Sequence, residues 1–152
     1  MTDALYTPAL LRLAADAHGA GRLTVPHVTG TAFNPACGDK VTMDLALESG
    51  RVTAIAHDTK ACVLAQASAS ILGVALKGAD KSAVETLRKE IATMLAAKAP
   101  APRSPFESYA AFEGAVEYES RHRCVLLPVD AVLAGFDAKP EGSGCRLPTL
   151  DP

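Results

Sequence analysis

NPACGD, residues 34–39, is the stretch around which the predicted fold is arranged. Its asparagine and proline favour a tight turn, and Gly38 accepts backbone conformations that other residues avoid. The turn brings the thiol of Cys37 and the carboxylate of Asp39 to one place. Thiolates and carboxylates are both zinc ligands in proteins. The stretch therefore predicts half of a metal site, and the other half must come from elsewhere in the chain.

Alternating polarity on the C-terminal side of this turn predicts a strand with one buried face. Its apolar positions recur at every second residue: Val41, Met43, Leu45 and Leu47. Ser49 and Gly50 form the next turn, and residues 51–58 are expected to return as the second strand of a hairpin. The faces of that strand are mixed, with Val52, Ala54 and Ala56 on one side and Thr53, Ile55 and His57 on the other. Residues 27–32 alternate weakly and predict a third strand before the turn.

Two helices are predicted on either side of the strands. Thr7 and Pro8 are typical of a helix cap and a first helical position, and this helix is expected to end near Gly19. Asp58 or Thr59 is expected to cap a helix over residues 61–76. Nearly every residue of that segment is apolar or small, which predicts a central helix without a solvent-facing side.

The C-terminal half predicts further helices. Asp80 or Ser82 begins one whose apolar residues have clear helical spacing: Val84, Leu87, Ile91, Met94 and Leu95. A proline-rich loop over 99–105 separates it from a short packed helix beginning near Phe106. A final apolar segment, 125–136, contains Pro128, which is expected to lie in a first helical turn.

Length and composition favour one globular domain. Of the 152 residues, 49% are hydrophobic and 21% charged, and the net charge is -2, which argues against generic binding to nucleic acid or to an anionic membrane. We expect an α+β fold, with a small antiparallel sheet of about three strands packed against helices on one face. The domain is expected to span residues 1–138, with a flexible tail over 139–152 that is rich in Gly and Pro.

The four cysteines bear on compartment and chemistry. No long apolar span or signal segment is evident, which predicts a cytoplasmic protein without membrane contact. Cytoplasmic thiols stay reduced, so the cysteines are metal ligands, nucleophiles or inert core residues. Cys62 is expected in the first turn of its helix, with Lys60 nearby, and Cys124 follows Arg123 at the head of the last helix. Both positions favour a thiolate.

Several motifs together resemble a known family. The NPACGD turn is followed by the hairpin, by Cys62 with Gln-Ala-Ser-Ala-Ser at 66–70, by Lys-Gly at 77–78, and by the Arg123-Cys124 pair. Over residues 5–137 this pattern resembles the scaffold proteins for iron-sulfur cluster assembly of the NifU N-terminal, IscU and SufU type. The resemblance implies a SufE/NifU-like two-layer sandwich.

The resemblance also implies a ligand set. By matched position, Cys37, Cys62 and Cys124 bind metal or cluster, and Asp39 is the labile oxygen ligand. Arg123 stands where IscU-type members have a histidine, and the chaperone-recognition segment of those members is missing upstream. The basic residue at that position and the longer gap between Cys62 and Cys124 are both similar to the SufU type, whose members bind zinc and accept sulfur from a cysteine desulfurase.

Three functional hypotheses remain open at this point. The first is a scaffold or sulfur acceptor that binds zinc, iron or a transient [2Fe-2S] cluster and works with a cysteine desulfurase and acceptor apoproteins. In it, Cys124 is the predicted persulfide acceptor. The second is a zinc-dependent sulfurtransferase partner that carries no cluster, and the third is a structural-zinc protein without sulfur chemistry. Whether the chain is an enzyme stays open. His122 is expected to be a surface residue, with an approach to the site left open, and Cys145 is expected to be a solvated thiol without a role.

Overall fold

A computed structural model describes residues 6–36 and 38–138 of the chain. Its elements, in chain order, are α1 (Pro8–Asp16), β1 (Val28–Asn34), β2 (Asp39–Glu48), β3 (Arg51–Lys60), α2 (Val63–Ala75), α3 (Lys81–Ala97), the 3-10 helices η1 (Glu107–Ala115) and η2 (Glu119–Arg121), and α4 (His122–Asp137). Cys37 and the predicted tail, with Cys145, lie outside the described residues.

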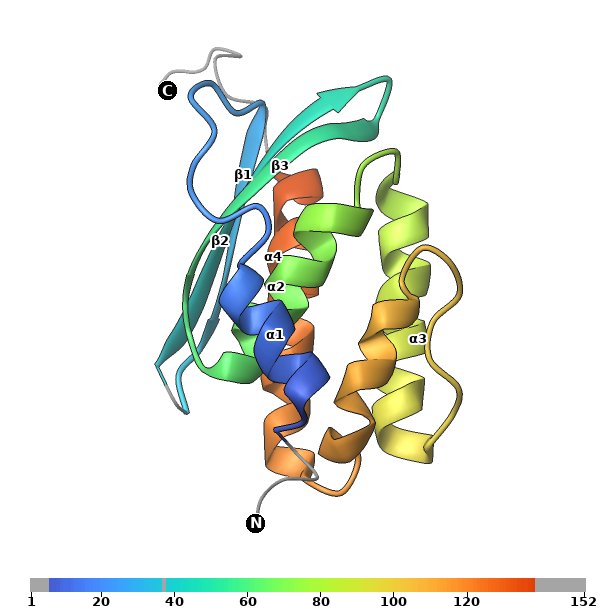
Figure 1. The fold of residues 1–152 in the computed structure, drawn as a ribbon. Helices are drawn as coiled ribbons and strands as arrows, with labels where there is room; N and C mark the ends of the chain where they lie inside the picture. The colour runs from blue at the N-terminus through green and yellow to red at the C-terminus, as the bar shows by residue number, and fades with distance from the viewer. Residues whose placement is uncertain (1–5, 37, 139–152) are drawn as a thin grey trace.

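The strands and helices form two layers. The three strands pair antiparallel in the order β1-β2-β3, and the helices gather on one side of the sheet (Figure 1). The predicted α+β architecture is confirmed. No helix among residues 6–36 and 38–138 combines the length and apolar character needed to cross a bilayer.

Helix α4 approaches β1 at a glycine. A Cβ atom added at Gly30 would lie 2.1 Å from the backbone nitrogen of Gly135 and 2.2 Å from the carbonyl oxygen of Ala131. Any side chain at position 30 would therefore push the helix off the sheet. A similar contact joins the end of α1 to α2, since a Cβ at Gly73 would lie 2.2 Å from the carbonyl oxygen of His18.

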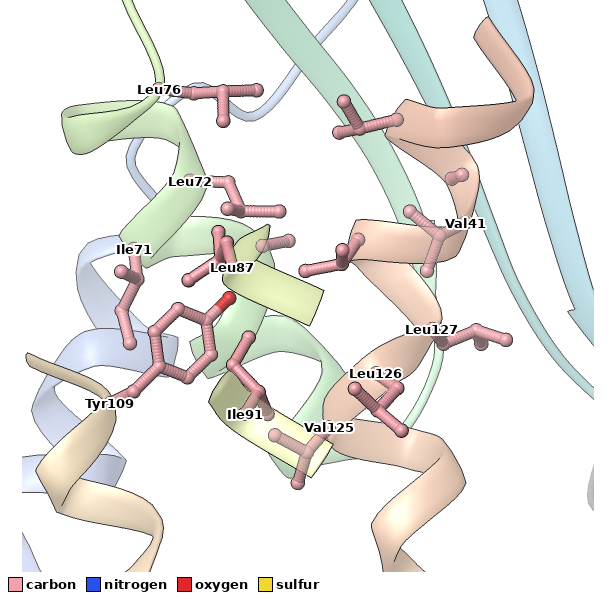
Figure 2. Packing of buried hydrophobic residues seen from close by; sticks show 14 of the residues in the cluster. Val41, Ile71, Leu72, Leu76, Leu87, Ile91, Tyr109, Val125, Leu126 and Leu127 are labelled. Atoms are coloured by element: carbon pink, nitrogen blue, oxygen red, sulfur yellow. The ribbon is translucent and has the colours of Figure 1, made fainter. Parts of the chain in front are cut away.

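One apolar core fills the space between the sheet and the helices. The five apolar residues that the sequence predicts on one face of α3 are the five that this helix buries. Figure 2 shows Leu87 and Ile91 of α3 beside Ile71 and Leu72 of α2, with the ring of Tyr109 among them. Burial of these apolar side chains is the main source of the fold's stability.

A bulge in the hairpin corrects the predicted faces of β3. Leu47 pairs with Val52 but Ala46 pairs with Ala54, so Thr53 is an extra residue on β3. A one-residue insertion reverses which side chains face the core. Ile55 therefore shares the buried face with Val52, opposite Leu45, and Ala54 does not.

Two local predictions were wrong at helix starts. Asp58 and Thr59 lie in β3, and the N-cap of α2 is Cys62, one residue before the helical turn in which it was expected. Pro128 lies inside α4, because that helix begins at His122. Proline has no backbone N–H, so Pro128 cannot donate the usual helical hydrogen bond to the carbonyl four residues earlier.

A buried carboxylate fastens the loop between α1 and β1 to the outer face of the sheet. Asp44 has no exposed surface and accepts hydrogen bonds from Arg22 Nε (2.6 Å), Arg22 Nη2 (3.0 Å), Thr29 Oγ1 (2.7 Å) and Leu23 N (3.1 Å). Burial acts most strongly on its pKa and raises it, but the hydrogen bonds from Arg22, Thr29 and Leu23 and the charge of Arg22 together hold the pKa below its ordinary value. Asp44 is therefore ionised and fully paired.

We expect Asp44→Asn to lower the free energy of unfolding by about 2 kcal/mol at neutral pH, because hydrogen bonds to a buried charge are lost. A carboxyl group with a lowered pKa stabilises the fold fully above its ordinary pKa of 3.8, and this stabilisation is lost as the pH falls through the lowered value. Urea unfolding from neutral to acid pH should therefore show the two proteins converging. Asp58→Asn, which changes a β3 residue on the same face of the sheet, is the control and should unfold close to wild type at neutral pH.

Candidate metal centre

The loop between β1 and β2 is closed by its own hydrogen bonds. The side-chain oxygen of Asn34 accepts from Ala36 N (3.1 Å), and Gly38 N donates to the carbonyl of Asn34 (2.8 Å). Gly38 has a φ of +78°, a conformation that side chains other than hydrogen disfavour. Asp39 then begins β2 opposite Asn34, with its side chain buried at 9% exposure. The predicted turn is thus present, and it points Asp39 toward the helices.

Three of the four predicted ligands come together. One carboxylate oxygen of Asp39 and the sulfur atoms of Cys62 and Cys124 all lie within 4.8 Å of one another. They come from the start of β2, the N-cap of α2 and the first turn of α4. Cys62 is half-buried and Cys124 is 4% exposed. Cys37, the fourth predicted ligand, lies outside the described residues.

The donor set fits a divalent metal ion. Zinc lies about 2.3 Å from sulfur and about 2.1 Å from carboxylate oxygen, so tetrahedral ligands of one ion are separated by about 3.6 to 3.8 Å. The three ligand atoms already lie within 4.8 Å of one another, so each pair needs to close by at most about 1 Å to share an ion. Two thiolates and a carboxylate suit zinc or iron, and they suit magnesium or calcium poorly.

Asp39 is oriented by α2. Its Oδ2 atom accepts a hydrogen bond from the backbone N–H of Cys62 at 3.2 Å. This amide is at the N-terminal end of a helix, where backbone N–H groups have no intrahelical partner and favour negative charge. The bond joins two ligands directly, so the position of the Asp39 carboxylate depends on where α2 begins.

Three basic residues lie close to the ligands in sequence. Lys40 directly follows Asp39, Lys60 precedes Cys62 by two residues, and Arg123 directly precedes Cys124; all three are exposed. Lys40 alternates with Asp39 along β2 and pairs with Lys60, so these two lysine side chains lie on the face of the sheet away from the helices. Lys60 and Arg123 were expected near the ligands from the sequence, whereas Lys40 was missed, although it directly follows a ligand.

The histidines do not join the ligand group. The ring of His122 donates from Nε2 to the carbonyls of Ala115 (3.0 Å) and Val116 (3.2 Å), which holds it against the end of η1. His57 is buried, and its Nε2 donates to the carbonyl of His18 at 2.9 Å. Burial lowers the pKa of His57, so this ring is neutral at pH 7. Among the described residues, the group of possible ligands contains neither histidine.

A buried hydroxyl links the helices that carry the two cysteines. Ser68 of α2 donates to the carbonyl of Val125, the residue after Cys124, at 2.8 Å. Its only proton is used there, so the hydroxyl of Tyr109 donates to Ser68 Oγ, also at 2.8 Å. The bond to Val125 joins α2 to the first turn of α4, and no sequence pattern indicates it.

Comparisons with known proteins agree with this geometry. A family model of the NifU-like N-terminal domain matches residues 5–125. The zinc-dependent sulfurtransferase SufU of Bacillus subtilis (strain 168) is 28% identical over 109 residues, which are 72% of this chain and 74% of that protein.

Solved structures share the fold. The N-terminal part of a nitrogen-fixing NifU-like protein from Brucella abortus superposes with a TM-score of 0.84 at 33% identity, over 89% of this chain and 94% of that one. A protein from Fervidobacterium islandicum AW-1, described as an iron-sulfur cluster assembly scaffold for the SUF system, superposes with a TM-score of 0.79 at 18% identity, over 90% of this chain and 99% of that one. The second likeness concerns the fold alone.

We expect Ser68→Ala to weaken Co²⁺ binding about tenfold and to change the visible spectrum of bound Co²⁺. Without the hydroxyl, the turn that carries Cys124 is free to shift against α2, and lost support behind metal ligands typically costs about 10- to 100-fold in affinity. Ser70→Ala is the matched control. Ser70 is also fully buried on α2, but it accepts from His18 N (3.1 Å) and so supports the end of α1.

Ser68→Ala removes the partner of the Val125 carbonyl and of the Tyr109 hydroxyl, and Ser70→Ala removes the partner of His18 N, so both variants should unfold at lower urea concentration than wild type. Only Ser68→Ala should alter the Co²⁺ spectrum. Equal spectra in the two variants would show that Ser68 stabilises the core without positioning the ligands.

Proposed function

The chain belongs to the NifU-like N-terminal domain family, and on that premise we propose that it acts in iron-sulfur cluster assembly as a scaffold and sulfur acceptor. Its site would bind zinc, iron or a [2Fe-2S] cluster through Cys37, Asp39, Cys62 and Cys124. A cysteine desulfurase would be the sulfur donor, and apoproteins would be the acceptors. The observation that carries the proposal is the convergence of Asp39, Cys62 and Cys124 from three separate elements.

Zinc bound at this site would hold the thiols as thiolates, the form that reacts with sulfur electrophiles. Asp39 supplies the one oxygen atom of the ligand set, and oxygen is the ligand that a thiolate-preferring ion retains least well. The amide of Cys62 stays available as a hydrogen-bond partner for the Asp39 carboxylate. The carboxylate of Asp39 could therefore keep its hydrogen bond to this amide after it leaves the metal ion.

The sulfur-transfer step is a thiol-disulfide type of exchange. A cysteine thiolate of this chain attacks the outer sulfur of the persulfide on the desulfurase. The sulfur-sulfur bond of the donor breaks, a new sulfur-sulfur bond forms on this chain, and the donor cysteine leaves as a thiolate. No external oxidant is consumed. Cys124 remains the predicted acceptor, and its burial at 4% exposure means that the first turn of α4 must open for the attack.

As a scaffold, the chain would hold a [2Fe-2S] cluster as cargo. Thiolates are the usual protein ligands of such clusters. Replacing one of them with the carboxylate of Asp39 would make the cluster easier to release to an acceptor protein. The same ligands thus serve both the scaffold hypothesis and the hypothesis of a zinc-dependent sulfurtransferase partner, which the curated SufU relative favours.

Single substitutions of Cys37, Cys62 and Cys124 by Ala should each lower the metal content of the purified protein at least about tenfold, because each removes a thiolate ligand. Elemental analysis after purification measures this. Buried Cys124→Ala also tests packing, so circular dichroism must show a retained fold before its metal content is compared. Unchanged metal content in all three variants would refute the proposed ligand set.

Anaerobic reconstitution with iron and sulfide separates the scaffold from the sulfurtransferase partner. A stable cluster spectrum that transfers to an apoprotein supports the scaffold, whereas retained zinc with stimulation of a desulfurase supports the sulfurtransferase partner. Removing the metal with a chelator addresses the third hypothesis. Since the apolar core extends through β2, α2, α3 and α4, we expect the chelated protein to remain folded. Complete unfolding without any effect on a desulfurase would indicate structural zinc alone.

A further inference from the structure

We propose that Phe33, Lys40 and Lys60 form a docking surface for an acidic protein partner, the cysteine desulfurase that supplies sulfur to the adjacent site. We call these three residues the basic row. The proposal rests on the proposed function and adds to it the surface and the charge of the partner. It also separates residues that recognise the partner from residues that hold the metal.

The basic row is defined by strand register. Phe33 of β1 pairs with Lys40 of β2, and Lys40 pairs with Lys60 of β3, so the three residues lie side by side across the sheet. They face away from the helices, because the alternate residues Val41 and Met43 are fully buried in the core. All three side chains are exposed, and Phe33 keeps 54% of its surface.

The charge of the row is not neutralised within the described part of the chain. Two lysines directly opposite each other on neighbouring strands repel, which destabilises the sheet. Neither Lys40 nor Lys60 forms an ion pair with a described carboxylate, although Asp58 lies in the next row, opposite Thr42. The whole chain has a net charge of -2, so this local positive charge runs against its composition.

An exposed aromatic side chain beside the two lysines gives the row the composition of a binding surface. Phenylalanine is enriched at protein interfaces, whereas it is rare on surfaces that only face water. A complementary partner presents carboxylates around an apolar hollow that receives Phe33. Acidic groups of that kind would steer the partner toward the row, and the steering would weaken with salt.

The position of the row connects it to the site. Lys40 directly follows Asp39, and Lys60 lies two residues before Cys62. Farther along the same face, the loop held by Arg22 and Asp44 covers the sheet. At the other end of this face, where Asp39 begins β2, the side chains of Phe33, Lys40 and Lys60 are exposed, so a partner bound there would lie beside the metal centre across the end of the sheet.

The test compares two double variants with the same change in net charge. Lys40→Glu/Lys60→Glu reverses the row, and Lys77→Glu/Lys89→Glu reverses two exposed lysines after α2 and on α3. A second comparison sets Phe33→Ala against Val74→Ala, a change at a residue of α2 that is 60% exposed. Each protein is titrated into a cysteine desulfurase at low and high salt, and both the half-saturating concentration and the maximal desulfurase rate are measured. Metal content is measured in parallel.

We expect the row variants to raise the half-saturating concentration at low salt about tenfold or more, with an unchanged maximal rate, unchanged metal content and a weaker salt dependence. The control variants should match wild type.

If the row variants lose metal but bind the desulfurase as wild type does, the lysines only compensate the charge of the site, and the proposal is overturned. If row and control variants behave alike, it is also overturned. If wild-type protein neither binds nor stimulates the desulfurase, the proposed function itself fails, and the docking surface fails with it.

Discussion

The contact between Gly30 and α4 is the constraint on which the metal centre depends. Because no side chain separates β1 from the helix there, Ala131 and Gly135 lie against the strand. From Gly30, β1 reaches its end at Asn34 after about 13 Å. From Ala131, α4 runs back to Cys124 over about 10 Å. Strand and helix therefore bring Asp39 and Cys124 to the same end of the molecule, where α2 adds Cys62.

The ligands are held by bonds that lie behind them. The amide of Cys62 holds the carboxylate of Asp39, and Ser68 holds the backbone beside Cys124. Neither bond needs a metal ion, so the arrangement belongs to the folded chain. The small residues of α2 let α1 and α4 approach this helix closely enough for hydrogen bonds to form between them.

The charged side chains at the two ends of the outer sheet face are paired differently. At one end the buried carboxylate of Asp44 is matched by Arg22 and closed by a loop, so its charge contributes to the fold. At the other end Lys40 and Lys60 lie opposite each other in the open. Such a pair of like charges destabilises the sheet, and this contrast is why we assign the lysines to recognition of a partner.

Local patterns in the sequence determined much of this protein: the cap of α1, the buried face of α3, the tight turn before Asp39 and the residue types of the ligand set all follow from spacing and backbone preference. The tertiary structure decided what depends on contacts between distant segments. A register counted from the turn at Ser49 and Gly50 would place Lys40 opposite Thr59, but the bulge at Thr53 places it opposite Lys60. The start of α4 before Pro128 and the bond from Ser68 to Val125 likewise depend on packing. Strand register and helix contacts are set by which surfaces exclude water together, and no local pattern encodes that.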